Sequence, residues 1–434
     1  MCLMKIFLKQ FVEKQLRYSP LFYRRLKAVQ ELEKASSNSI DARREEKLLL
    51  LIHKAYRKSS FYKALYDRHG VDINQIKSIR DLHLCPIVTR QDVVEHHQSI
   101  FCGYPLSSKK TASSGTSGQS VTVYRDYASI IEEGAYQWAH RMRFGHYPGM
   151  KTVVIRGNLS AQERERYNPF TKTLYLSSFQ LNRKNTDWYF QRICDFAPNA
   201  IFAYPSSVES LASLFIEKNQ CLRVPLVFTS SETLYSYQRE KVQQAFSSQI
   251  VDWYGNAERS IALKENADNT YDQLPLYSIN EFREDRVITT SLINFSFPLI
   301  RYEVDDVILL NDEDGSPAWQ RKVRAIQGRS DDVLVLSDGT RIGLICNAFD
   351  GIDHIRMSQV VQQDQKTIDV NLVVADAYSR DEEAQLTKQL KESIGENTPF
   401  ALNYVVEDKI IKSDSGKFKL IVNHMHPDGE SLSV

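Results

Sequence analysis

The sequence lacks any uncharged apolar run of the roughly 18 to 20 residues that a bilayer-spanning helix requires. Its densest apolar run, from Leu48 to Ile52, is short and lies between Lys47 and Lys54. Residues 1–16 interleave lysines and a glutamate with apolar side chains, which breaks up the apolar centre that a signal peptide needs. We therefore expect an amphipathic helix at the N-terminus and no membrane span.

The sequence also lacks a charge bias and a cysteine framework. Its 55 basic and 54 acidic residues give a net charge of +1, which does not favour nucleic acid as a partner. Six cysteines are scattered over 434 residues without a CxxC pair, so they are expected to be reduced thiols of a cytoplasmic protein. Two of them lie near three histidines at spacings that match no standard zinc site, namely His83, Cys85, His96, His97 and Cys102.

The two best-known nucleotide fingerprints are absent, since the chain contains neither a Walker A loop nor a GxGxxG segment. A different polar loop is present instead, in which glycines allow close backbone approach and hydroxyls and N–H groups can surround phosphate oxygens. It consists of Ser113, Ser114, Gly115, Thr116, Ser117 and Gly118. Taken alone, this loop fits a disordered linker equally well.

The pattern of apolar residues divides the chain. Residues 1–100 have helical spacing, whereas short apolar strands alternate with amphipathic helices from 121 onward, which is typical of βαβ units. A polar, turn-prone segment at 328–332 precedes a strand, a charged helix and a further strand. We predict an α/β protein with a large N-terminal domain of several subdomains (1–330), with mixed or parallel sheets and helices. A small α+β lid domain (331–434) follows it.

Four further segments follow the polar loop in a fixed order, and each is weak evidence alone. They are Tyr254-Gly255-Asn256-Ala257-Glu258, Arg301-Tyr302-Glu303-Val304-Asp305-Asp306, Gly328-Arg329-Ser330-Asp331-Asp332 and Ser415-Gly416-Lys417. With this order, the chain resembles the adenylate-forming superfamily of acyl- and aryl-CoA synthetases. It most resembles the phenylacetate-CoA ligase family, including relatives found with capsule polysaccharide genes. The segments Ser60–Lys63, Asp81-Leu82, Pro86–Thr89 and Phe297–Tyr302 extend the resemblance over nearly the whole chain.

The resemblance implies a role for each matching residue. The loop at 113–118 would hold the β- and γ-phosphates of ATP, and Glu258, after Tyr254 and Gly255, would help to hold Mg²⁺. Asp306 would accept hydrogen bonds from the ribose diol. Arg329 would contact the nucleotide and Asp331 would be the hinge between the domains. Lys417 would be the catalytic lysine, which neutralises charge as the carboxylate attacks phosphorus.

The acid pocket is expected near a group of small and aromatic residues that would equally suit an ordinary core. These are Tyr204, Pro205, Ser206, Ser207, Phe228, Ser231 and Tyr254. Two positions depart from the family pattern: Ala257 stands where the family has Thr, and Asp305 stands where it has Gly. Both departures put the catalytic vigour of the enzyme in doubt.

The implied reaction has two steps. A small-molecule carboxylic acid attacks Mg-ATP to give an acyl-adenylate, and a thiol, either coenzyme A or an acyl carrier protein, then accepts the acyl group after the lid rotates. A role in capsule or surface polysaccharide biosynthesis follows from the resemblance. Two alternatives stay open from the sequence: transfer of AMP to a hydroxyl acceptor, and a catalytically weak nucleotide-binding scaffold protein.

Overall fold

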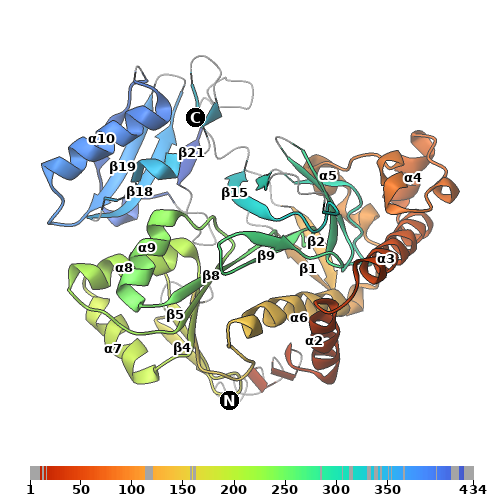
Figure 1. Cartoon of the computed structure of the whole chain (residues 1–434), viewed down its shortest axis with the longest axis horizontal. Coiled ribbons are helices and arrows are strands. Elements are labelled where there is room, and N and C mark those ends of the chain that lie inside the picture. The colour runs from red at the N-terminus through yellow and green to blue at the C-terminus, as the bar shows by residue number, and fades with distance from the viewer. Residues whose placement is uncertain are drawn as a thin grey trace. The chain divides into compact units, whose positions relative to one another are not determined.

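The structure is a computed structural model of the whole chain (Figure 1). It describes residues 10–11, 14–15, 17–112, 121–156, 159, 163–283, 286–304, 306–311, 316–329, 334–336, 341–342, 345–349, 351–352, 354–364, 367–396, 398–411 and 420–424. The chain forms two compact units, each made from two segments. The first unit combines residues 1–149 with 253–325, and the second combines residues 150–252 with 326–434.

The first unit begins with helices whose first turns are capped by side chains. The hydroxyl or carboxylate oxygen of the residue before each helix accepts a hydrogen bond from a first-turn amide, which satisfies a donor that the helix itself leaves open. The capping residues are Ser19, Ser36, Ser59, Thr89 and Asp126. They precede α2 (Pro20–Leu32), α3 (Ser37–Lys58), α4 (Ser60–Arg68), α5 (Arg90–Ile100) and α6 (Tyr127–Arg143).

The strands of the first unit pair mainly as antiparallel neighbours. A hairpin joins β1 (Ser108–Ala112) to β2 (Thr122–Asp126), and β11 (Ser278–Phe282), β12 (Val287–Ser291) and β13 (Tyr302–Val304) form a three-stranded sheet. A further set is ordered β14 (Asp306–Leu310), β15 (Val323–Arg329), β10 (Tyr271–Gln273) and β9 (Ala262–Glu265). The end of β8 (Gln249–Gly255) pairs with β9.

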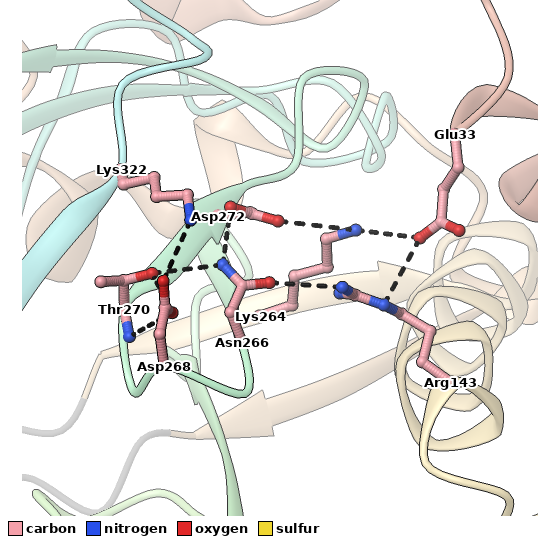
Figure 2. A network of polar contacts seen from close by, with 8 residues as sticks. All are labelled: Glu33, Arg143, Lys264, Asn266, Asp268, Thr270, Asp272 and Lys322. Carbon is pink, nitrogen blue, oxygen red and sulfur yellow. Dashed lines mark hydrogen bonds and ion pairs between the residues drawn. The ribbon is translucent and has the colours of Figure 1, made fainter.

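A polar network connects the ends of α2 and α6 to the turn between β9 and β10 (Figure 2). The Lys264 ammonium lies 3.0 Å from the Glu33 carboxylate, and the Arg143 guanidinium donates to the Asn266 side-chain oxygen at 3.3 Å. The network continues through Asp272, Thr270, Asp268 and Lys322. Exposed ion pairs of this kind contribute at most about 1 kcal/mol each, so the buried helix faces supply most of the stability.

The second unit contains a parallel sheet in the order β7 (Leu226–Ser230), β6 (Ala200–Ala203), β3 (Thr152–Arg156) and β5 (Thr173–Ser177). Strand β4 (Glu165–Asn168) pairs with β5 as an antiparallel edge. Helices α7 (Thr186–Phe196), α8 (Pro205–Glu217) and α9 (Ser236–Phe246) share one hydrophobic core with these strands and lie together beside them in Figure 1. The first half of β8 also belongs to this unit.

The C-terminal residues of the second unit form an α+β layer. A four-stranded sheet runs β20 (Ala401–Tyr404), β19 (Ile368–Val374), β18 (Ile355–Gln362) and β21 (Ile421–Asn423). Helix α10 (Arg380–Ile394) buries Leu386, Leu390 and Ile394 in the core shared with β18 and β19. The short hairpin β16 (Leu334–Val335) with β17 (Arg341–Ile342) precedes this sheet. Short 3₁₀ segments also occur at 73–75, 79–84, 105–107, 345–349 and 407–409.

The predicted α/β class with mixed or parallel sheets is confirmed, because β7, β6, β3 and β5 run parallel whereas β4, β9 and β10 have antiparallel neighbours. No described helix combines the length and the apolar character that crossing a membrane demands. The expected N-terminal helix at 1–16 lies largely outside the described residues. The division into a domain of 1–330 and a lid of 331–434 stays a prediction. The described strands beyond 331 pair only with one another.

Arg301 joins three segments of the first unit that are far apart in sequence. Its buried guanidinium binds both carboxylate oxygens of Glu281 at 2.9 Å and donates to the carbonyl oxygens of His83 and Cys85. Its backbone has a φ of 49°, in the left-handed region, and its amide donates to the Thr290 hydroxyl. A non-glycine residue in that region costs free energy, so the side-chain contacts must hold the backbone there.

We predict that Arg301→Met lowers the free energy of unfolding by about 3 kcal/mol, because it leaves the Glu281 carboxylate and two carbonyl groups without their partner. The matched control is Arg286→Met, which removes the Arg286–Glu303 ion pair from the same sheet at a more exposed position. It should cost less than about 1 kcal/mol. Denaturant unfolding followed by circular dichroism measures both, and equal losses would show that Arg301 is not an anchor.

Candidate functional site

Tyr254 and Asp306 meet in the first unit although they are far apart in sequence. The Tyr254 hydroxyl donates to Asp306 Oδ2 at 2.5 Å. Tyr254 lies near the end of β8, opposite Leu263, and Asp306 is the first residue of β14. Two of the motif segments therefore converge on one place. A Cβ at the neighbouring Gly255 would lie 3.3 Å from the indole nitrogen of Trp253, which explains why a side chain is disfavoured there.

Glu258 lies in the turn that follows β8. It is 5 % exposed, and its carboxylate lies 3.5 Å from the Arg90 guanidinium at the start of α5. The positive charge of an arginine offsets part of the cost of burying a carboxylate. Arg90 therefore holds the Glu258 carboxylate at a fixed position within the first unit.

The hairpin that carries the polar loop reaches the same turn. The Arg125 guanidinium of β2 donates to the backbone carbonyl of Ala257. Burial lowers the pKa of Arg125 to about 10, and the nearby Arg259 also lowers it while Glu133 opposes the shift. The contact uses the backbone of Ala257, so the departure from threonine at this position does not affect it.

Ala112 pairs with Thr122, so the two ends of the polar loop lie side by side at the top of the β1–β2 hairpin. The loop itself, from Ser113 to Gly118, lies outside the described residues, as do Asp305, Asp331 and Lys417. The backbone of Arg329 belongs to β15, but its side chain is also outside them.

The described part of this site offers a divalent cation one carboxylate, that of Glu258, and not a full set of protein ligands. Among the described residues, no group of three or more His, Cys, Asp or Glu side chains could hold a metal ion. Mg²⁺ commonly binds through one or two carboxylates and the phosphates of its substrate, with water completing the shell. Glu258 fits that mode of binding, because it supplies one carboxylate that Arg90 holds in place.

Apart from Tyr254, the expected acid-pocket residues lie in the second unit, at or near the carboxyl ends of its parallel strands. Ile155 pairs with Ala203 and Ala203 pairs with Thr229, so the next residues, Arg156, Tyr204 and Ser230, form one row across three strands. The Arg156 guanidinium donates to the Ser230 hydroxyl at 2.9 Å and lies 5.5 Å from the centre of the Tyr204 ring. Burial raises the pKa of the Tyr204 hydroxyl.

The remaining expected pocket residues have more ordinary roles. Phe228 packs edge-on against Phe202 with 5.3 Å between the ring centres, and Ser207 is buried in the first turn of α8. Ser231 is exposed and has a φ of 76°. The backbone amide of Ser206, also in that turn, donates to the Glu232 carboxylate at 3.0 Å. Phe228 therefore belongs to the core, whereas Tyr204 and Ser231 lie at the strand ends.

A cavity of about 330 Å³ in the first unit is separate from all of these residues. It lies among α2, α6 and β10, with Leu32, Tyr136 and Trp319 among its lining, and none of the predicted site residues lines it. Its size alone therefore does not mark it as the functional site.

The sequence pattern did not indicate three charged residues of these clusters: Arg90, Arg125 and Arg156. Each follows an unremarkable local sequence, and only the fold brings it to a motif residue. The sequence offers one indication, for Arg90 alone, because Arg90 directly follows the Pro86–Thr89 segment that resembles the family.

The profile of a family described as the CapK C-terminal domain matches residues 334–424. Protein CapK of Staphylococcus aureus is 23% identical over 97% of this chain and 95% of its own length. The phenylacetate-coenzyme A ligase of Escherichia coli (strain K12) is 25% identical over 70% of this chain and 74% of its own length.

Among solved structures, 2-hydroxyisobutyryl-CoA ligase in the postadenylation state, in complex with R3-HIB-AMP, has a TM-score of 0.70. The match covers 89% of this chain and 90% of that one at 15% identity. At that identity the likeness concerns the fold. The predicted relationship is confirmed: the chain is homologous to CapK and to the phenylacetate-CoA ligases, and it has the acyl-CoA ligase fold.

Proposed function

We propose that this protein uses ATP to convert a carboxylic acid into an acyl-adenylate and then transfers the acyl group to a thiol, coenzyme A in the first instance. The contact between Tyr254 and Asp306 carries this proposal, because it unites two segments that resemble the nucleotide-binding motifs of adenylate-forming enzymes. The homology to phenylacetate-coenzyme A ligases and the shared fold support it.

In the proposed site, Asp306 accepts hydrogen bonds from the two ribose hydroxyls of ATP. A carboxylate suits a vicinal diol, because it offers two acceptor oxygens and no donor. Tyr254 holds the carboxylate in position through its hydroxyl, which donates at 2.5 Å. Tyr254 thus acts as a positioning residue for Asp306.

Glu258 binds Mg²⁺ together with the phosphates of ATP, and Arg90 keeps its carboxylate in place. The cation, when bound, offsets negative charge on the phosphates. Arg125 joins the β1–β2 hairpin to the turn that carries Glu258, so the strand ends at Ala112 and Thr122, on either side of the proposed phosphate loop, and the Glu258 turn belong to one part of the unit. Arg329 is proposed to contact the nucleotide.

Lys417 is proposed to act between the substrate carboxylate and the α-phosphate, where an ammonium stabilises the charge that develops. The carboxylate oxygen forms a bond to the α-phosphorus while the bond to pyrophosphate breaks. Rotation of residues 331–434 about Asp331 would then withdraw Lys417 and admit the thiol. The roles proposed for Lys417, for Asp331 and for the rotation of residues 331–434 rest on the resemblance of these segments to the motifs of the family.

The thiol acceptor, the compartment, the biosynthetic role and the acid pocket complete the proposal. Coenzyme A is the proposed acceptor, an acyl carrier protein is the alternative thiol, and the cytoplasm is the proposed compartment. A place in capsule or surface polysaccharide biosynthesis is proposed from the relationship to CapK. Tyr204 and Ser231, at the strand ends of the second unit, are the proposed walls of the acid pocket, with Ser207 and Phe228 behind them.

Exchange of labelled pyrophosphate into ATP, measured with a panel of carboxylic acids, tests the proposal directly. The expected result is exchange that depends on the acid. A stable AMP-modified product formed without an acid would instead indicate transfer to a hydroxyl acceptor. Binding of ATP without exchange for any acid would indicate a scaffold protein, and either result would contradict the proposal.

We predict that Asp306→Ala raises the KM for ATP by roughly 10- to 100-fold, because hydrogen bonds to a charged group contribute about 1.5–3 kcal/mol. Tyr254→Phe keeps the carboxylate but removes one hydrogen bond, so its KM should rise by about 5- to 10-fold. Asp268→Ala is the control, since Asp268 is an exposed carboxylate in the polar network of Figure 2. Initial rates of exchange at varied ATP measure all three, and an unchanged KM in Asp306→Ala would remove Asp306 from the site.

We predict that Lys417→Ala slows adenylate formation by about 10²–10³-fold, the usual effect of losing an electrostatic stabiliser of the transition state. Thioester formation from pre-formed acyl-adenylate and the thiol should stay near the wild-type rate, because the proposed work of Lys417 is complete by then. Single-turnover assays of the two half-reactions measure this split. Equal loss of both rates would indicate a structural lysine.

A further inference from the structure

Arg156, Tyr204 and Ser230 form a row at the point where the connections between the parallel strands of the second unit change direction. From the end of β3 the chain continues to β4 and β5 on one side, whereas from the end of β6 it continues through α8 to β7 on the other. Connections that leave two neighbouring parallel strands in opposite directions open a crevice at their carboxyl ends, and ligands bind there in open α/β sheets. Arg156 ends β3 and Tyr204 follows β6, so these two residues lie at this switch point of the sheet.

The Arg156 side chain crosses the end of β6. Neighbouring strands lie about 4.8 Å apart, so the backbones of Arg156 and Ser230 are separated by two strand spacings of roughly 10 Å. Only an extended side chain reaches across that span, and the guanidinium does so above the Tyr204 ring. The positive charge of Arg156 is therefore held above Tyr204, the middle residue of the row.

Among the described residues, the guanidinium of Arg156 has no carboxylate partner, unlike three other arginines of the same unit. Arg183, Arg192 and Arg356 each form an ion pair with a glutamate. Among the described residues, Arg156 has one hydrogen-bond acceptor, the neutral Ser230 hydroxyl, and its covered Nε has none. Burial lowers the pKa of Arg156, which reflects the unfavourable environment of its charge.

The two nearest acidic residues are already engaged with other groups. Asp252 accepts from the Thr229 hydroxyl at 2.5 Å, and Glu232 accepts from the Ser206 amide at 3.0 Å. They raise the pKa of Arg156 from a distance but form no ion pair with it among the described residues. A partly buried cation without an ion-pair partner is costly, and it is typical of a site where a ligand supplies the opposite charge.

We propose that Arg156 binds a second anionic group of the substrate acid, so that the preferred acid carries a carboxylate or phosphate in addition to the carboxylate that is activated. This proposal rests on the proposed function. Arg156 is a specificity residue and not the partner of the reacting carboxylate, because a tight arginine contact there would stabilise the ground state and oppose attack on phosphorus. The Tyr204 ring forms the apolar floor beneath the charge.

The test compares acids that differ only in the charge of their far end. Glutarate is paired with its monomethyl ester, and 4-carboxyphenylacetate is paired with 4-acetylphenylacetate; 4-phosphonophenylacetate separates a phosphate-like group from a carboxylate. The wild-type protein should show a kcat/KM in pyrophosphate exchange roughly 10- to 100-fold higher for the charged member of at least one pair. The KM for ATP should not depend on the member used.

Arg156→Gln should abolish this preference while it leaves the neutral member within about 3-fold of wild type, and Arg156→Lys should retain part of it because it keeps the charge. Arg166→Gln is the matched control, because Arg166 also lies 5.5 Å from a tyrosine ring, that of Tyr175, in the same sheet. Circular dichroism and thermal unfolding show whether the variants are folded. No preference in the wild-type protein, or an equal loss for both members in Arg156→Gln, would overturn the proposal.

A failure of the proposed function is distinguished by direct binding. If no acid supports exchange, calorimetric titration of the same pairs into the wild-type protein and Arg156→Gln measures the preference without turnover. Tighter binding of the charged member to wild type alone would keep Arg156 as an anion site, although the ligase proposal had failed. Equal binding to both proteins would overturn the assignment of Arg156.

Discussion

The ion pair between Arg301 and Glu281 is the contact on which the arrangement of the first unit depends. The guanidinium also holds the carbonyl groups at 83 and 85, and the adjacent backbone exchanges hydrogen bonds with Val88. Two further bonds connect the Tyr62 hydroxyl to the backbone of Pro298 and Ile300. Segments from the beginning and the end of this unit are thereby tied together a few residues before Asp306. The position of Asp306, and therefore of its contact with Tyr254, follows from this packing.

The motif segments that resemble the phenylacetate-CoA ligases thus fall into two physical classes. Tyr62, Val88 and Arg301 are buried or paired with backbone groups, which fits a role in folding. Tyr254 and Asp306 bring polar groups to the ends of strands, which fits a role in binding. Sequence resemblance does not separate the folding residues from the binding residues, because it records only that the same residue types occur at matching positions. Burial and hydrogen bonding separate them.

The regular elements were predictable from the sequence, whereas the ionic contacts of the site were not. Helix α9 (Ser236–Phe246) and strand β6 (Ala200–Ala203) lie in the stretch after residue 121 where the apolar pattern predicts alternating strands and helices, since apolar spacing is a local property. Strand β18 was missed, although its buried residues fill the C-terminal core, because its sequence mixes polar and apolar residues without alternation. Arg156 ends a strand that was predicted, yet its importance depends on two neighbouring strands whose order the sequence does not reveal. Long-range pairing, and not local propensity, determines which charges meet.

The contrast between the two arginines nearest the proposed binding groups separates positioning from recognition. Arg90 has its counter-charge within the protein, in Glu258, so that its charge is satisfied before any ligand arrives and it can only orient. Arg156 has the Ser230 hydroxyl and the Tyr204 ring as its described neighbours. Neither carries a negative charge that could balance the guanidinium. A protein with a net charge of +1 can therefore contain a strongly cation-selective or anion-selective point, because selectivity depends on local pairing and not on the sum. Among the described residues, Arg156 forms no ion pair, and it lies at the ends of parallel strands, where the proposal has the substrate supply the opposite charge.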